Sequence, residues 1–231
     1  FSPYGPESHA FEYSNGVMVD LGSLGGTVSY AFAINDSGLI VGRSQIVGDQ
    51  HQVAVSYTNG SVVPLGSLGG DDSEALAINN NGIIVGDSWT VNDAADHAFE
   101  DIGGTLTDLG TLGGLESRAE AINDNGVIVG DSTTSGWNDD RAFIEDDGQM
   151  TDLNSLVTNL PADFVLEEAT AINDSGQILA NGAFELPGGS GQYESFLLTP
   201  VPERFPGLMS AIPLGLLLLL HRKTSEIPSD F

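Results

Sequence analysis

Hydrophobic and polar residues alternate over short stretches along most of the chain, and turn residues separate these stretches. The segments HAFEY at 9–13, SYAFAIN at 29–35 and LIVGRS at 39–44 show the alternation clearly. A period of two is typical of strands that bury one face. Between two of them lies the segment Asn-Asp-x-Gly, whose residues tolerate the backbone angles of a tight hairpin. The pattern therefore predicts an all-β fold of short strands.

These predicted strands recur in a fixed order. The segment DLGSLGG at 20–26 returns at 64–70 and 108–114, and in altered form at 152–156. The hairpin segment at 33–44 returns after steps of 44, 44 and 50 residues. Four strands in about 44 residues match the size of a propeller blade. Residues 1–200 are therefore predicted to form a β-propeller of about four 44-residue, four-stranded repeats, in which the first and last segments complete one blade. The alternatives are an open β-solenoid or part of a larger propeller.

Three motifs together indicate a family. The combination of HAF, D-L-G-[ST]-L-G-G and A-I-N-D-x-G-x-I-V-G resembles the HAF-repeat family of bacterial extracellular proteins, over roughly residues 9–200. This resemblance implies that the repeats are exported. The histidine is absent from two of the repeat copies, so it is not required for the repeat to form.

The last segment, residues 201–231, is built differently. Residues 205–220 read FPGLMSAIPLGLLLLL, and these sixteen uncharged residues precede the basic cluster HRK. A membrane-spanning helix needs about 20 apolar residues, so the run predicts a hydrophobic C-terminal helix that contacts a membrane. With its flanks, the segment resembles the PEP-CTERM sorting signal, which implies an exosortase-like processing enzyme as a partner. The residues of the sorting motif are Val201, Pro202, Glu203, Arg204, Arg222 and Lys223. A plain membrane anchor with its basic residues in the cytoplasm is the alternative.

Charge separates these two parts of the chain. The 33 acidic residues outnumber the 6 basic ones and give a net charge of −27, all of which lies on residues 1–200. Proteins that bind nucleic acid use clusters of Lys and Arg, so this composition excludes a general nucleic-acid binder. The chain has no cysteine, which excludes disulfides, thiolate metal sites and a cysteine nucleophile.

One strand face varies from repeat to repeat. In the strand before each Ala-Ile-Asn turn, alanines fill one register, which suits closely packed sheets, whereas the other register changes. If the variable register lines a channel, a ligand is recognised there. Sequence drift at tolerant, solvent-facing positions is the simpler explanation. The ligand-binding candidates are Tyr30, Phe32, Glu74, Arg118 and Glu120, together with Trp89 and Trp137 at neighbouring loop positions.

Other residues suggest chemistry less strongly. His9, His51 and His97 occupy one repeat position, so they are expected to lie far apart and to be structural. Pairs of aspartates in predicted loops, Asp71 with Asp72 and Asp139 with Asp140, are weak calcium candidates, since calcium takes 6–8 oxygen ligands. Solvated loop charge is the simpler explanation. No motif for a hydrolase, a metalloprotease or phosphate binding is present.

These observations favour an exported, non-catalytic protein of the cell envelope or extracellular matrix. Its repeats are expected to bind extracellular polysaccharide or protein. No cofactor is expected, and calcium is the one candidate. The alternatives are a glycan-active enzyme that uses loop carboxylates and a purely structural surface protein.

Overall fold

The computed structural model describes residues 7–58, 60–135, 139–158, 160–184, 193–200 and 218–221. In this part of the chain the fold is all-β, as the alternating pattern predicts. Two 3-10 turns, η1 and η2, accompany the strands. The elements are β1 (Phe11–Ser14), β2 (Val17–Asp20), β3 (Gly25–Ile34), β4 (Ile40–Ile46), β5 (Gln52–Thr58), β6 (Ser61–Gly66), β7 (Gly69–Ile78), β8 (Ile84–Thr90), η1 (Val91–Asp93), β9 (Asp96–Asp101), β10 (Leu106–Gly110), β11 (Ser117–Ile122), β12 (Ile128–Thr133), β13 (Asp140–Asp146), β14 (Gln149–Asp152), η2 (Leu153–Ser155), β15 (Val157–Thr158), β16 (Phe164–Ile172), β17 (Ile178–Phe184), β18 (Tyr193–Pro200) and β19 (Leu218–His221).

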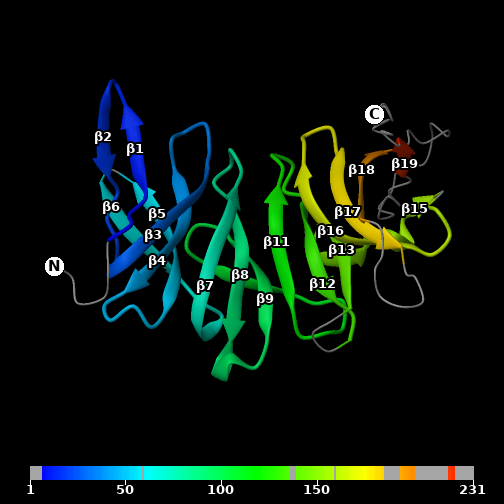
Figure 1. Ribbon diagram of the computed structural model, residues 1–231, viewed down its shortest axis with the longest axis horizontal. Coiled ribbons are helices and arrows are strands. Elements are labelled where there is room, and N and C mark those ends of the chain that lie inside the picture. The colour runs from blue at the N-terminus through cyan, green and yellow to red at the C-terminus, as the bar shows by residue number, and fades with distance from the viewer. Residues whose placement is uncertain are drawn as a thin grey trace, which may run out of the picture.

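The strands form successive antiparallel sheets that stand side by side along the long axis of the molecule (Figure 1). The first three large sheets are β3-β4-β5-β6, β7-β8-β9-β10 and β11-β12-β13-β14. The last contains β16, β17 and β18, followed by β19, which pairs with β15 in parallel. Strands β1 and β2 form a separate two-stranded sheet at the N-terminal end. The four repeats of the sequence therefore correspond to four sheets.

The predicted closure by strand exchange is wrong. Strand β18 pairs with β17 and supplies the third strand of the last sheet, so β1 and β2 are not needed there. In Figure 1 the first and last sheets lie at opposite ends of the molecule. Within the described ranges, the sheets do not close into a ring.

Each Ala-Ile-Asn turn is fixed from within, and the first three are tied to the next sheet. In the second repeat, Asn79 Oδ1 accepts hydrogen bonds from the backbone N–H groups of Asn81 and Ile83, both at 3.0 Å. The following Gly82 has a φ of +80°, which glycine adopts without strain. Asn79 Nδ2 donates to the carbonyl of Asn123 in the third repeat at 3.0 Å. Equivalent bonds join Asn35 to Asn79 and Asn123 to Asn173, so an asparagine ladder connects all four sheets.

The core lies between the sheets rather than within one of them. Val41 of the first sheet packs against Ala75 and Ile78 of the second, and the same arrangement follows between later sheets. The alanine register is crowded in the last three sheets, where Ala75, Ala119 and Ala169 are fully buried, whereas Ala31 of the first sheet is exposed. Close packing of these small residues brings the neighbouring sheets together.

The C-terminal helix predicted over residues 205–220 is not seen among the described residues. Residues 218–221 instead form β19, which pairs with β18. Residues 205–217 lie outside the described residues, as do Val201, Pro202, Glu203, Arg204, Arg222 and Lys223. Within the described ranges, no helix has the length and hydropathy of a membrane span.

Candidate functional site

The variable register forms one continuous strip across the four sheets. Tyr30, Glu74, Arg118 and Glu168 occupy equivalent positions in the first strand of each sheet, and each faces a cross-strand partner in the second strand. We call this strip the charged row. It comprises Tyr30, Phe32, Arg43, Glu74, Asp87, Arg118, Glu120, Asp131 and Glu168.

An aromatic pair begins the charged row. The rings of Tyr30 and Phe32 are parallel, with centroids 6.1 Å apart. The guanidinium of Arg43 lies over both, 4.9 Å from the Tyr30 centroid and 5.7 Å from that of Phe32. Both rings are 43% exposed. The predicted ligand-binding aromatics of the first sheet therefore present an accessible apolar surface beside a cation.

Ion pairs continue the row into the second and third sheets. Arg43 pairs with Glu74 across the gap between sheets. Arg118 reaches back from β11 to Glu74 at 3.6 Å and to Asp87 at 3.1 Å, and also contacts Glu120 at 3.2 Å. The structure thus brings together three residues that the sequence analysis had selected for their variability: Glu74, Arg118 and Glu120.

Asp87 is the most buried carboxyl group of the row. Burial and, to a smaller extent, the nearby charge of Asp96 raise its pKa to about 8, although Arg118 acts in the opposite direction. Its Oδ1 lies near the Arg118 guanidinium but has no hydrogen bond of good geometry. The ion pair therefore compensates only part of the desolvation. A hollow of about 210 Å³ adjoins this site and is lined partly by Trp89.

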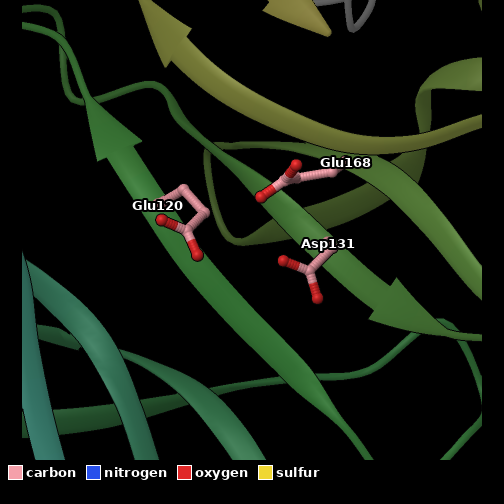
Figure 2. A group of neighbouring side chains, drawn as sticks. All are labelled: Glu120, Asp131 and Glu168. Carbon is pink, nitrogen blue, oxygen red and sulfur yellow. The ribbon is translucent and has the colours of Figure 1, made fainter. Parts of the chain in front are cut away.

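Three carboxyl groups meet at the far end of the row. Figure 2 shows Glu120 of β11, Asp131 of β12 and Glu168 of β16 directed toward one another, and one oxygen from each lies within 4.8 Å of the others. Burial, with the charges of Glu120 and Glu168, raises the pKa of Asp131 to about 7. Glu168 accepts a hydrogen bond from Asn181 Nδ2 at 3.2 Å. Three carboxylates supply up to six oxygen atoms, the kind of ligand that calcium takes.

The calcium candidates chosen from sequence lie elsewhere, and mostly in strands rather than loops. Asp71 and Asp72 belong to β7 and flank His51, with Asp72 Oδ1 accepting from the backbone N–H of Gln52 at 2.7 Å. Asp139 pairs with Arg141 at 2.7 Å, and Asp140 begins β13. Among the described residues, neither pair contributes to a group of three potential metal ligands.

Trp89 has a different position from the one expected. Trp89 lies within β8 and not in a loop, which places it beside Asp87 near the row. Trp137 lies outside the described residues.

The repeated histidines form structural pairs. His9 Nδ1 lies 3.0 Å from Asp20, and His97 Nδ1 lies 2.9 Å from Asp108, so the HAF and DLG motifs of one repeat meet across a strand pair. The bond to His9 lowers the pKa of Asp20. Asp108 Oδ1 also accepts from the backbone N–H of Gly110 at 2.7 Å. These pairs lie in separate sheets, as expected for a structural role.

Sequence reasoning missed the second-strand members of the row. Arg43, Asp87 and Asp131 follow the constant Ile-Val-Gly segment, where they lie directly opposite Tyr30, Glu74 and Arg118. The signal that could identify them is the register of the predicted hairpin, which places the residue after each Ile-Val-Gly segment opposite the variable register.

Comparison with known proteins gives one family. A family model described as a protein of unknown function, DUF3466, matches residues 26–194. No curated protein and no solved structure matches the chain. The matched residues include all of the charged row and all four Ala-Ile-Asn turns. Because the model covers most of the chain, the protein belongs to the DUF3466 family.

Proposed function

We propose that this protein is an exported, non-catalytic binding protein whose charged row binds extracellular polysaccharide. The observation that carries the proposal is the contrast between the row and its framework. The turn and core residues are nearly the same in every repeat, whereas no two repeats present the same set of row residues. A row of different side chains on a repeated framework is suited to a long ligand that meets several sheets at once.

The chemistry of the row favours an uncharged polysaccharide. The exposed rings of Tyr30 and Phe32 match the apolar face of a sugar ring, and the carboxylates beyond them accept hydrogen bonds from hydroxyl groups. The row has five carboxyl groups and only two guanidinium groups, on a chain of net charge −27. An acidic polymer is repelled by such a surface.

The proposed location rests on the sequence, and the propeller-like architecture rests on the order of the sheets. The repeats and the segment at 201–231 support export to the cell envelope or the extracellular matrix, with sorting by an exosortase-like enzyme or retention as a membrane anchor. The order of the four sheets supports an open arc of propeller blades.

The proposal is tested with purified full-length chain and a panel of uncharged polysaccharides, by affinity electrophoresis with calcium and with chelator. We expect retardation by at least one polysaccharide, with the affinity reduced at least tenfold in Phe32→Ala and in Glu120→Gln. The matched control is Tyr13→Ala, because Tyr13 is an exposed aromatic residue of β1 outside the row. If the polysaccharide retards the chain in the presence of calcium but not in the presence of chelator, the carboxyl groups bind it through the cation.

Two results overturn the proposal. One is the absence of binding to the whole panel, which favours a protein ligand or a structural role. The other is release of reducing ends that is lost in Asp131→Asn. That result establishes a glycan-active enzyme, since paired carboxyl groups with a raised pKa are the machinery of glycoside hydrolysis.

A further inference from the structure

Two hollows lie next to each other beside the charged row. The first, of about 210 Å³, is the one that adjoins Asp87, and residues of β5, β7, β8, β9 and β11 line it. The second, of about 290 Å³, is lined by residues of β4, β5, β7 and β8 and of the turn between β4 and β5. Gln52, Asp72 and Trp89 line both hollows. A single elongated ligand can therefore reach from one hollow into the other alongside Trp89.

Two buried carboxyl oxygens of the first hollow have no hydrogen-bond partner in the described part of the chain. They are Oδ1 of Asp87 and Oδ1 of Asp96, and both residues line the hollow. Asp87 is only 9% exposed, and its Oδ1 lies 3.1 Å from Arg118 Nε without a hydrogen bond of good geometry. A buried acceptor without a partner costs free energy. Each oxygen is therefore an acceptor that a donor from a ligand would satisfy.

The first hollow also carries more negative charge than its one cation compensates. Asp72, Glu74, Asp87 and Asp96 line it, and Arg118 is the only cationic residue among the described residues of the lining. Burial and nearby carboxylate charges raise the pKa of Asp87 to about 8 and that of Asp96 to about 6. A raised pKa of this kind marks a carboxyl group that lacks a compensating cation. The hollow is therefore suited to a positively charged ligand.

The second hollow offers a further pair of carboxylates, from Asp49 and Asp72. Asp49 Oδ1 accepts the backbone N–H of Thr27 at 2.6 Å, and Asp72 Oδ1 accepts that of Gln52 at 2.7 Å. These bonds hold both side chains in place. The second oxygen of Asp72 lies 3.5 Å from His51 Nδ1. Because a carboxylate has about four acceptor positions, each of the two can accept another donor.

The arrangement favours an organic ammonium group over a metal ion. Among the described residues, the carboxylates of the two hollows do not form a group of three potential metal ligands. An ammonium group instead donates three separate hydrogen bonds, which can reach oxygens that lie further apart. The Trp89 ring offers a surface for methylene groups and attracts cations. The net charge of −27 also attracts cations to the chain.

We propose that the two hollows together bind one linear aliphatic diamine or polyamine. One ammonium group would donate to Asp87 and Asp96, and a second would donate to Asp49 and Asp72. The methylene chain between them would lie along Trp89. The inference goes beyond the proposed polysaccharide binding and does not depend on it, because the ligand belongs to a different class and is tested without any polysaccharide.

The test is isothermal titration calorimetry of the full-length chain with α,ω-diamines of increasing chain length. The ionic strength is about 0.15 M, at which charges in solvent are screened within about 8 Å. The matched probes are hexylamine, which has one ammonium group, and 1,6-hexanediol, which has none. We expect one diamine to bind per chain, with an affinity that passes through a maximum at one chain length and exceeds that of hexylamine about tenfold. 1,6-Hexanediol is expected not to bind.

Two variants separate the two hollows. Asp87→Asn changes the first hollow, where the unpartnered oxygens lie, and is expected to weaken both hexylamine and the best diamine about tenfold. Asp49→Asn changes only the second hollow, so it should weaken the diamine and leave hexylamine unchanged. Both substitutions keep the size of the side chain, and thermal unfolding verifies that the variants fold. The control is Glu145→Gln, which removes a buried carboxylate of β13 outside both hollows and should leave both affinities unchanged.

Three results overturn the proposal. One is an affinity for hexylamine as high as that for every diamine, since a second ammonium group then contributes nothing. Another is an equal loss in Asp87→Asn and Glu145→Gln, which indicates diffuse attraction to the acidic chain. The third is displacement of the diamine by calcium at an equal concentration, which assigns the hollows to a metal ion.

Discussion

The asparagine ladder gives the sharpest test of how the sheets are held together. Replacing Asn79 by alanine removes two hydrogen bonds within the turn and one to the carbonyl of Asn123. Asn79 is buried, so water does not fully replace these partners. A net value of about 1 kcal/mol per hydrogen bond predicts a loss of about 3 kcal/mol in the free energy of unfolding. Asn79→Asp keeps the acceptor for the turn but replaces the donor with a carboxylate oxygen that the Asn123 carbonyl repels, so we expect it to destabilise the chain as well.

The matched control is Asn173→Ala at the exposed end of the ladder. Asn173 also accepts two backbone N–H groups, from Ser175 and Gln177, but its amide bonds to the Gln177 side chain rather than to another sheet. We expect this variant to lose only about 1 kcal/mol, because water reaches the site. Urea unfolding followed by circular dichroism and by tryptophan fluorescence measures both losses. A loss in Asn79→Ala no larger than that in Asn173→Ala would refute the role of the ladder.

Two further outcomes follow from buried groups. Asp87 keeps its proton in the folded chain up to about pH 8, whereas an unfolded aspartate loses it near pH 4, so stability falls as pH rises through this window. The contribution of Asp87 should make the free energy of unfolding about 2 kcal/mol higher at pH 6 than at pH 8. Urea titrations at the two pH values should show a smaller difference in Asp87→Asn than in the parent chain. An unchanged difference would argue against the raised pKa of Asp87. A β-carbon at Gly86 would collide with the carbonyl of Glu74, so Gly86→Ala should cost about 2 to 3 kcal/mol. Gly104→Ala meets no neighbouring atom and should cost about 1 kcal/mol for its positive φ alone; equal shifts in thermal midpoint for these two variants would count against the collision.

Local sequence patterns predicted the strands and turns because both depend on neighbouring residues. The alternation in SYAFAIN and LIVGRS corresponds to β3 and β4, and the turn glycines adopt positive φ as their motif requires. The repeated alanines predicted a crowded face, which Ala75 and Ala119 confirm. The same reasoning placed Trp89 and the paired aspartates in loops, because strand ends are poorly defined by alternation alone.

The sequence by itself determined the all-β fold, the four repeats and the variable register, since each is a property of residues close together in the chain. Only the tertiary structure decided how the sheets are arranged and which side chains come into contact. Glu120, Asp131 and Glu168 come from three strands in two sheets, and their proximity depends on the packing between those sheets. The two hollows beside Trp89 likewise depend on how the first three sheets pack. A repeat pattern specifies the contact that each sheet makes with the next, but the array's shape and its uncovered ends follow from packing of the whole chain.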